Sequence, residues 1–299
     1  MPRPPRPGRS VGAALVRGAA WLRRRGFDDA RLDADLLLGE VLGVDRAGLV
    51  IRGRDDVSRT DLLRFARLLR RRRDHEPVAY LRGRREFAGL ELTVGPGVLV
   101  PRPETEELVD RSRALLPPAG AGRVVRALDV GTGSGAIALA LAAARPDLEV
   151  VALDRSRAAA RCADANAARL GLGARVRVLV GDVRTLAHTF APESFDLFVS
   201  NPPYVAPDEP RLATELRHEP RLALVGEVGP FPAVYARLAA AAERLLRAGG
   251  ALCVEVGAGQ AERVGETIAA TRALSPVAVA ADLAGVERVV SAVRRARSG

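Results

Sequence analysis

From about Arg123 onward, short apolar runs typical of buried strands alternate with helical patterns, and this alternation constrains the fold more than any other feature of the sequence. Strands are expected over residues 124–130, 149–153, 175–180 and 195–200, and near 251–256, 276–280 and 288–293. Helices are expected from the glycine-rich stretch after residue 130 to residue 144, and over residues 157–170 and 234–245. Such alternation predicts a mostly parallel, doubly wound sheet whose ligands bind beyond the carboxyl ends of its strands.

The chain before this region is predicted to be helical from residue 11 to about residue 74. Apolar residues recur there with a helical period in three segments. They are Val11, Ala14, Leu15 and Leu22, then Leu32, Leu36, Leu37 and Val41, then Leu62, Phe65, Ala66 and Leu69. Asp61 or Thr60 is expected to cap the third helix, and glycines separate it from the second. The pattern predicts a small helical bundle.

A change of period marks the connection between these two regions. Apolar runs on either side of Gly95-Pro96-Gly97 predict a β-hairpin with its turn at these residues. The stretch Pro101-Arg102-Pro103-Glu104-Thr105 follows, and a proline with carboxylates after it suits the start of a helix. The predicted segments are a disordered tail at residues 1–10, a helical domain at 11–80, a hairpin connector at 81–101 and an α/β domain at 102–299.

The chain is strongly basic, with a formal net charge of +10 and an isoelectric point of about 11.0. All of its basic side chains are arginine apart from three histidines, because the sequence contains no lysine. A positive surface attracts RNA, DNA or acidic partners. An arginine-rich composition throughout the chain gives the same charge, however, so the charge alone does not identify a nucleic-acid substrate.

Several classes of protein are disfavoured by the sequence. No apolar run approaches the roughly 18 residues of a membrane span, and no signal-peptide core follows the N-terminal Arg and Pro residues. A cytoplasmic protein is therefore expected. Cys162, Cys253 and the histidines His75, His188 and His218 lack the spacing of metal ligands, so no metal site is predicted.

A glycine-rich stretch, Gly131-Thr132-Gly133-Ser134-Gly135, ends the first strand of the α/β domain. Glycines there let backbone N–H groups at a helix N-terminus approach a ligand closely. Together with Ala136 the stretch also fits the dinucleotide pattern G-x-G-x-x-G/A, so it suits nicotinamide or flavin as well as S-adenosylmethionine, and a tight turn without a ligand is the remaining alternative. Asp154, which ends the second strand, is placed to accept hydrogen bonds from the ribose of either cofactor. Asp182 ends the third strand and either meets an adenine amino group or caps the next helix.

The fourth strand runs directly into Asn201-Pro202-Pro203-Tyr204. Proline has no N–H and cannot continue a central strand, so the chain must leave the sheet here. The side-chain carbonyl of Asn201 and the backbone carbonyl of Pro202 can then grip the two N–H bonds of a planar amide or amine, while Tyr204 stacks on the planar group. Two acceptors in this arrangement aim the nitrogen at a methyl group and favour the positive charge that develops on it.

These motifs carry a family resemblance. The tetrapeptide at residues 201–204 together with the glycine-rich stretch resembles methyltransferases that act on exocyclic amines of DNA and RNA and on protein amides. Residues 76–110, EPVAYLRGRREFAGLELTVGPGVLVPRPETEELVD, resemble more narrowly the release-factor glutamine methyltransferases, the PrmC/HemK family. The same family is indicated by residues 30–38, 218–224, 255–257 with Gln260, and 282–285 with 288–290.

The resemblance implies a seven-stranded, Rossmann-like class I methyltransferase sheet that uses S-adenosylmethionine to methylate the glutamine of the Gly-Gly-Gln motif in class I peptide-chain release factors. It implies cofactor contacts from Gly131 to Gly135 and from Asp154, Asp182, Val183 and Asn201. Asn201, Pro202, Pro203 and Tyr204 would hold the glutamine, and Phe87 with Pro101, Arg102, Pro103, Glu104 and Thr105 would close the pocket. The helical domain and hairpin would grip the release factor, and neither a stable nucleic-acid partner nor a membrane is implied.

The sequence departs from the family at two places. Val183 stands where the family often has an aromatic residue against the adenine, so we expect packing on the ring rather than stacking. Residues 226–232, GEVGPFP, replace a more acidic stretch. The rival functions are adenine-N6 methylation of DNA or RNA, for which no target-recognition domain is evident, an RNA-binding module on a retired fold, and a nicotinamide dehydrogenase, for which no hydride-transfer acid or base is evident.

Overall fold

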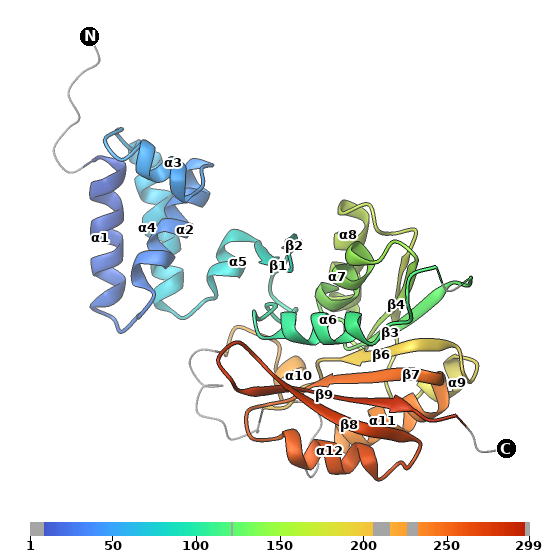
Figure 1. Cartoon of the computed structure of the whole chain (residues 1–299). Coiled ribbons are helices and arrows are strands. Elements are labelled where there is room, and N and C mark those ends of the chain that lie inside the picture. The colour runs from blue at the N-terminus through green and yellow to red at the C-terminus, as the bar shows by residue number, and fades with distance from the viewer. Residues whose placement is uncertain (1–8, 121, 206–215, 226–232, 297–299) are drawn as a thin grey trace. The chain divides into compact units, whose positions relative to one another are not determined.

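The computed structural model describes residues 9–120, 122–205, 216–225 and 233–296, and it divides into two compact units (Figure 1). One unit comprises Met1–Arg84 with Thr214–His218, and the other comprises Arg85–Ala213 with Glu219–Gly299. Of the tail expected at residues 1–10, residues 1–8 lie outside the described part of the chain. Ser10 is described, and its hydroxyl accepts the N–H of Ala13 and caps the first helix.

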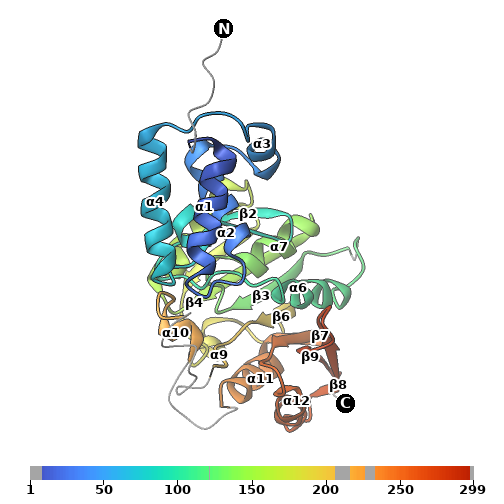
Figure 2. The ribbon, with the colours of Figure 1, turned by 90° about the vertical axis from the view of Figure 1, so that its left-hand side faces the viewer.

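Helices make up the first unit. They are α1 (Val11–Arg23), α2 (Ala30–Leu42), α3 (Arg46–Ile51), α4 (Arg59–Arg73) and α5 (Val78–Arg82). Figures 1 and 2 both show α1, α2 and α4 side by side, with the short α3 at one end of them. Their shared core includes Leu15, Leu22, Leu37 and Phe65, all of them buried. The predicted helical bundle is confirmed, and its core is formed mainly by the apolar faces identified from the sequence.

The start of α4 differs from the prediction. The hydroxyl of Ser58, not a group of Thr60 or Asp61, caps the helix by accepting a free N–H of its first turn, that of Asp61, at 3.0 Å. A capping residue needs an extended backbone, and Ser58 has it with ψ at 154°. The Ser58 hydroxyl also donates to the carboxylate of Asp61 at 2.7 Å. A serine followed three positions later by an acidic residue is therefore the better sequence signal for the start of this helix.

The buried face of α2 also differs from the prediction, because it contains two carboxylates. Leu32 is 39% exposed, whereas Asp33 and Asp35 are buried. Asp33 accepts from Arg72 at 2.7 Å and Asp35 accepts from Arg31 at 2.8 Å. Burial raises the pKa of Asp33, and the Arg72 guanidinium acts in the opposite direction. The ion pairs satisfy carboxylates that would otherwise be costly to bury.

Seven strands form the sheet of the second unit, in the order β5-β4-β3-β6-β7-β9-β8. They are β3 (Val125–Val130), β4 (Leu148–Asp154), β5 (Val176–Val180), β6 (Phe195–Ser200), β7 (Leu246–Glu255), β8 (Leu274–Ala281) and β9 (Glu287–Arg294). The pairs from β5 to β7 are parallel, and β9 is antiparallel to both β7 and β8. This arrangement confirms the predicted seven-stranded, mostly parallel sheet.

Helices cover both faces of this sheet, as Figures 1 and 2 show. One core contains residues of α6 (Thr105–Ala114), α7 (Ala136–Ala144) and α8 (Arg157–Arg169). The other contains residues of α9 (Leu186–Thr189), α11 (Ala233–Leu245) and α12 (Ala261–Ala269). The short helix α10 (Arg221–Leu224) precedes α11. Helices on both faces bury the strands β3, β4 and β6 almost completely, which explains their near-continuous apolar sequences.

The hairpin is present but its turn is not where the sequence analysis placed it. Strands β1 (Arg84–Phe87) and β2 (Leu90–Thr93) flank Ala88-Gly89, and residues 98–100 are not a strand. Both turn residues have positive φ, 48° at Ala88 and 75° at Gly89. Two-residue hairpin turns favour positive φ because it matches the twist of the flanking strands. An alanine in this conformation is uncommon, so the sequence signals this turn less strongly than it signals one at Gly-Pro-Gly.

Asn166 of α8 links the hairpin to the glycine-rich stretch. Its side chain is fully buried, and its Oδ1 accepts the N–H of Thr93 at 2.8 Å. Its Nδ2 donates to the carbonyl of Thr93 at 3.0 Å and to the carbonyl of Ser134 at 2.9 Å. One amide therefore satisfies backbone groups of β2 and of the loop that follows β3.

The penultimate residue of β3, Asp129, is a carboxyl group inside the sheet with no exposed surface. The Thr132 hydroxyl donates to its Oδ2 at 2.7 Å. Burial raises the pKa of Asp129 to about 7, although the hydrogen bond from Thr132 acts in the opposite direction. A carboxyl group in this position favours its neutral form.

We expect Asn166→Ala to lower the free energy of unfolding by about 2–4 kcal/mol, because each buried backbone group that loses its partner costs about 1–3 kcal/mol. Asp164, which is exposed on the same helix, provides the control. Asp164→Ala should change the free energy of unfolding by less than about 0.5 kcal/mol. Urea unfolding measures both variants, and equal stabilities would contradict the role of Asn166.

Asp129→Asn should reveal a pH-dependent cost of the buried carboxyl group. The pKa of Asp129 is higher in the folded protein than in the unfolded chain. As the pH rises, the unfolded chain therefore loses this proton first, and the free energy of unfolding falls until the pH reaches the folded pKa. Relative to Asp129→Asn, the wild-type free energy of unfolding should fall by up to about 4 kcal/mol between pH ~4 and pH ~7. Urea unfolding across that range measures the difference. A difference that does not change with pH would contradict the prediction.

Candidate functional site

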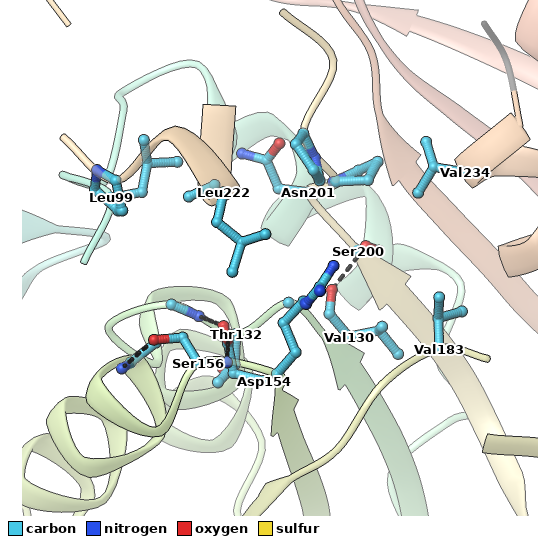
Figure 3. A pocket seen from close by; sticks show the side chains of 18 of the residues that line it. Leu99, Val130, Thr132, Asp154, Ser156, Val183, Ser200, Asn201, Leu222 and Val234 are labelled. Atoms are coloured by element: carbon cyan, nitrogen blue, oxygen red, sulfur yellow. Dashed lines mark hydrogen bonds between the residues drawn. The ribbon is translucent and has the colours of Figure 1, made fainter. Parts of the chain in front are cut away.

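The residues that follow β3, β4, β5 and β6 meet at one edge of the sheet, because these four strands are neighbours and run in the same direction. A cavity of about 450 Å³ lies at this edge and is lined by residues from all four strand ends. Figure 3 shows Asn201 across the cavity from Thr132 and Asp154, with Val183 towards one end and Leu99 towards the other. The sequence-predicted strand ends are therefore brought together around a single space.

The glycine-rich stretch forms a tight loop between β3 and α7. The N–H groups of Gly131 and Thr132 both donate to the carbonyl of Leu153 in β4, at 2.8 and 3.0 Å. Gly135 has a φ of 85°, and a Cβ there would lie 3.2 Å from the Cβ of Ala163. Only glycine combines this conformation with such close packing of the loop on α8. Four residues of the stretch, from Gly131 to Ser134, line the cavity.

Asp154 holds this loop while it faces the cavity. Its Oδ2 accepts the N–H of Gly133 at 2.9 Å, and its Oδ1 accepts the N–H of Ser156 at 2.8 Å. Burial raises the pKa of Asp154, and the two N–H groups act in the opposite direction. Each carboxylate oxygen has two acceptor sites, so Asp154 can bind the loop and still accept from the hydroxyl groups of a ligand.

Asp182 and Val183, which follow β5, both line the cavity. The Asp182 carboxylate accepts the backbone N–H of Arg184 at 2.9 Å and its guanidinium at 2.8 Å. The hydrogen bond from the Arg184 side chain lowers the pKa of Asp182. Val183 packs against the core formed with α11 and α12. Asp182 thus makes a local turn contact with Arg184 but does not cap the next helix, α9, whose N-cap residue is Thr185, and it lies at the cavity wall.

Asn201 and Tyr204 are held at the end of β6 by side chains from other elements. Asn201 is half-buried, and its Nδ2 donates to the hydroxyl of Thr105 at 3.2 Å. The Tyr204 hydroxyl donates to Oε1 of Glu255 at 3.1 Å, and the Tyr204 carbonyl accepts from Gln260 at 3.2 Å. Burial raises the pKa of the Tyr204 hydroxyl. Pro202 and Pro203 complete this wall of the cavity.

The predicted closing segment is only partly at the cavity. Pro101, Arg102 and Thr105 line it. Pro103 and Glu104 are exposed at the beginning of α6 and are absent from the cavity lining.

Phe87 also lies away from the cavity, contrary to the expectation that it helps to close the pocket. It is 1% exposed and belongs to the hydrophobic core below the hairpin. Its position as the last residue of β1 directs its side chain to the buried face of the two-stranded sheet, where it packs with Leu92 and Leu108.

Glu219 is a site residue that the sequence analysis did not single out. It is 4% exposed, its Oε2 accepts the N–H of Val100 at 2.9 Å, and its Oε1 forms an ion pair with Arg102. Glu219 directly precedes Pro220 and α10, which supply Leu222 to the cavity lining. It therefore joins the two segments that flank the cavity on the side of Leu99. The signal available in the sequence was an acidic residue within the stretch 218–224, which resembles the release-factor glutamine methyltransferases.

Other kinds of site are not evident in the described part of the chain. Within it, no three His, Cys, Asp or Glu side chains form a group that could hold a metal ion. No helix among the described residues is long and apolar enough to cross a membrane. Cys162 is half-buried and Cys253 is buried, and both are free thiols. The stretch at residues 226–232 lies outside the described residues.

Two family models match separate parts of the chain. Residues 13–83 match the model described as PrmC N-terminal domain. Residues 123–278, which contain the glycine-rich loop and the Asn201–Tyr204 segment, match the model described as methyltransferase domain. The matched regions include most of the helical unit and most of the sheet.

Relatives extend the similarity over nearly the whole chain. A release factor glutamine methyltransferase of Bradyrhizobium diazoefficiens is 41% identical over 287 residues, which are 95% of this chain and 95% of the relative. One of Bordetella pertussis is 44% identical over 260 residues, which are 87% of this chain and 93% of the relative. A solved structure of a release factor-specific protein-(glutamine-N5) methyltransferase from Alicyclobacillus acidocaldarius is 30% identical and covers 69% of this chain and 100% of that structure, with a TM-score of 0.41. With this identity extending through both units, the chain belongs to the release factor glutamine methyltransferase family.

Proposed function

We propose that this protein transfers a methyl group from S-adenosylmethionine to the side-chain amide nitrogen, N5, of the glutamine in the Gly-Gly-Gln motif of class I peptide-chain release factors. The observation that carries the proposal is the position of Asn201 and Tyr204, which line a cavity shared with the glycine-rich loop and Asp154. The names of the relatives support the choice of substrate. A cytoplasmic location, where translation factors act, is part of the proposal.

The residues at the strand ends fit the chemistry of the cofactor. Asp154 has acceptor sites for ribose hydroxyls, and the loop from Gly131 to Gly135 lets a ligand approach the N-terminus of α7. Asp182 and Val183 would contact the adenine, and Val183 would offer it an apolar surface rather than a ring. S-adenosylmethionine supplies a methyl group activated by its sulfonium. The cavity volume of about 450 Å³ suits a ligand of this size.

Asn201 and Pro202 orient the acceptor. Because Nδ2 of Asn201 donates to Thr105, its Oδ1 is the group left to accept an N–H of the substrate amide. The Pro202 carbonyl accepts the second N–H, so the nitrogen is held with its face towards the methyl donor. An amide nitrogen is a weak nucleophile, and these two acceptors stabilise the positive charge that develops on it during transfer. The proton is lost afterwards.

Recognition of the protein substrate requires a surface beyond the cavity. We assign it to the helical unit and to the hairpin of β1 and β2, as the family resemblance implies. The positive net charge of the chain would suit either an acidic protein or a nucleic acid as a partner. We propose no stable nucleic-acid partner. Adenine-N6 methylation of DNA or RNA is the rival that the same two acceptors would serve.

The substrate can be tested with labelled S-adenosylmethionine. The protein is mixed separately with a release factor, with the same factor carrying Gln→Ala in its Gly-Gly-Gln motif, with DNA and with RNA. We expect label only in the unmutated release factor, because only it offers the glutamine amide. Label in nucleic acid alone would overturn the substrate assignment, and label in the Gln→Ala factor would move the reaction to another residue.

Asn201→Ala should lower kcat by about 10²–10³-fold, as expected when one preorganised hydrogen-bonding group is removed from a reacting centre. Binding of S-adenosylmethionine, measured by calorimetry, should be partly retained because the glycine-rich loop and Asp154 are unchanged. The folded state is checked by circular dichroism. A variant that binds the cofactor and retains wild-type kcat would contradict the assigned role of Asn201.

A further inference from the structure

Gln260, at the wall of the cavity, connects two segments that are distant in the sequence. It follows the loop that leaves β7 and is the N-cap residue of α12. Its side-chain amide has a partner at each end. Oε1 accepts the N–H of Gly257 at 3.0 Å, and Nε2 donates to the carbonyl of Tyr204 at 3.2 Å. Gln260 therefore joins the loop after β7 to the segment after β6.

Gly257 leaves room for the Gln260 amide in this position. A Cβ at Gly257 would lie 2.9 Å from Cδ of Gln260 and 3.0 Å from its Nε2. Gly257 does not have a positive φ, so the backbone itself would accept another residue there. What a side chain at this position would disturb is the amide of Gln260.

Tyr204 is held at a second point by the same loop. Its hydroxyl donates to Oε1 of Glu255, the last residue of β7, at 3.1 Å. The carbonyl and the hydroxyl of Tyr204 are therefore both bonded to side chains from the short stretch 255–260. This stretch begins at the end of β7, the strand that pairs with β6, so it lies beside the point where the chain leaves β6.

The two prolines before Tyr204 make this anchor important. Pro202 and Pro203 have no N–H to donate, and their rings fix φ. They form a stiff segment whose position is set mainly at its ends. β6 holds one end, and the contacts of Tyr204 hold the other. The Pro202 carbonyl, which we assign to an N–H of the substrate amide, lies between these two ends.

We propose that Gln260 is a positioning residue for methyl transfer. By holding the Tyr204 carbonyl, it directs the Pro202 carbonyl and the Tyr204 ring towards the methyl acceptor. The oxygen and the nitrogen of its amide both have partners in the chain, so Gln260 acts through Tyr204 and takes no part in bond making. The proposal rests on the proposed methyl transfer and deepens it.

Kinetics of Gln260 variants provide the first test. Gln260→Met keeps the size of the side chain but removes both hydrogen bonds, and it should lower kcat by about 10–100-fold, since misplacement of a substrate-holding group by about 1 Å costs on that order. KM for the acceptor and the Kd of S-adenosylmethionine should change by less than about 3-fold, because the lost interaction acts in the transition state. Circular dichroism checks the fold.

Gln260→Glu separates the two hydrogen bonds. A carboxylate can still accept the N–H of Gly257, but it cannot donate to the Tyr204 carbonyl. This variant should therefore lose at least as much kcat as Gln260→Met. Glu262→Gln makes the reverse exchange at an exposed position of α12 and should leave kcat unchanged.

Gly257→Ala provides a test in which Gln260 is retained. The added methyl group would displace the flexible end of the Gln260 side chain, so kcat should fall as in Gln260→Met. Because both changes act on one contact, the double variant Gly257→Ala/Gln260→Met should be no slower than Gln260→Met alone.

Three kinetic results would overturn the proposal. They are losses that multiply in the double variant, a Gln260→Met variant with wild-type kcat, and a Gln260→Met variant whose loss lies wholly in the Kd of S-adenosylmethionine. The rates are measured on whichever acceptor the wild-type protein labels, so a wrong choice of substrate is recognised separately.

A second test needs no activity. Tyr204-Val205 is the only Tyr-Val pair in the sequence. Labelling the tyrosine carbonyl carbon with ¹³C and the valine nitrogen with ¹⁵N therefore gives one signal in an NMR spectrum that correlates the two atoms. A hydrogen bond deshields the carbon of a carbonyl group, so Gln260→Met and Gly257→Ala should both move the Tyr204 carbonyl signal upfield.

Tyr80-Leu81, in the helical unit, provides the control for this spectrum. With ¹⁵N-leucine in place of ¹⁵N-valine, the carbonyl signal of Tyr80 should be the same in the wild type and in both variants. A Tyr204 carbonyl signal that neither Gln260→Met nor Gly257→Ala moves would overturn the proposal even if no methyl acceptor were found.

Discussion

Parallel pairing of β4, β3, β6 and β7 brings the C-terminal ends of four neighbouring strands to one edge of the sheet. At this edge the backbone must leave the sheet, and its polar groups lose their ladder partners. Glycines after β3 and prolines after β6 make the exits sharp. The polar groups that remain are held by side chains, as Asp154 accepts the N–H of Gly133 and Gln260 donates to the carbonyl of Tyr204. The site is thus assembled from groups that the sheet itself leaves unpaired.

Buried carboxyl groups hold the walls of the cavity. Asp154, Glu219 and Glu255 are each at most 9% exposed, and each accepts hydrogen bonds from a segment that lines the cavity. Removing a carboxylate from water is costly unless donors surround it. Apolar residues in their place would often give a more stable fold. These carboxyl groups instead fix the positions of the cavity walls through directional hydrogen bonds.

Much of the sheet was predictable, because β3, β4 and β6 are almost completely buried and therefore have near-continuous apolar sequences. The residues at their ends followed directly from this. The partners of those residues were not predictable, since Tyr204 and Glu255 are 51 positions apart and Val100 and Glu219 are 119 positions apart. No local pattern encodes such contacts. The hairpin turn was misplaced because Ala88 adopts a positive φ that its side chain normally disfavours.

The amide of Asn166 has a consequence for the hairpin. Its oxygen accepts the N–H of Thr93, and its NH2 group donates to the carbonyls of Thr93 and Ser134. Neighbouring residues of a strand direct these backbone groups to opposite edges. A slip of β2 by one position would thus leave the Asn166 amide facing the wrong edge of the strand. The alignment of the hairpin on α8 is therefore set by hydrogen-bond polarity as well as by shape, and a sliding motion between them is opposed chemically.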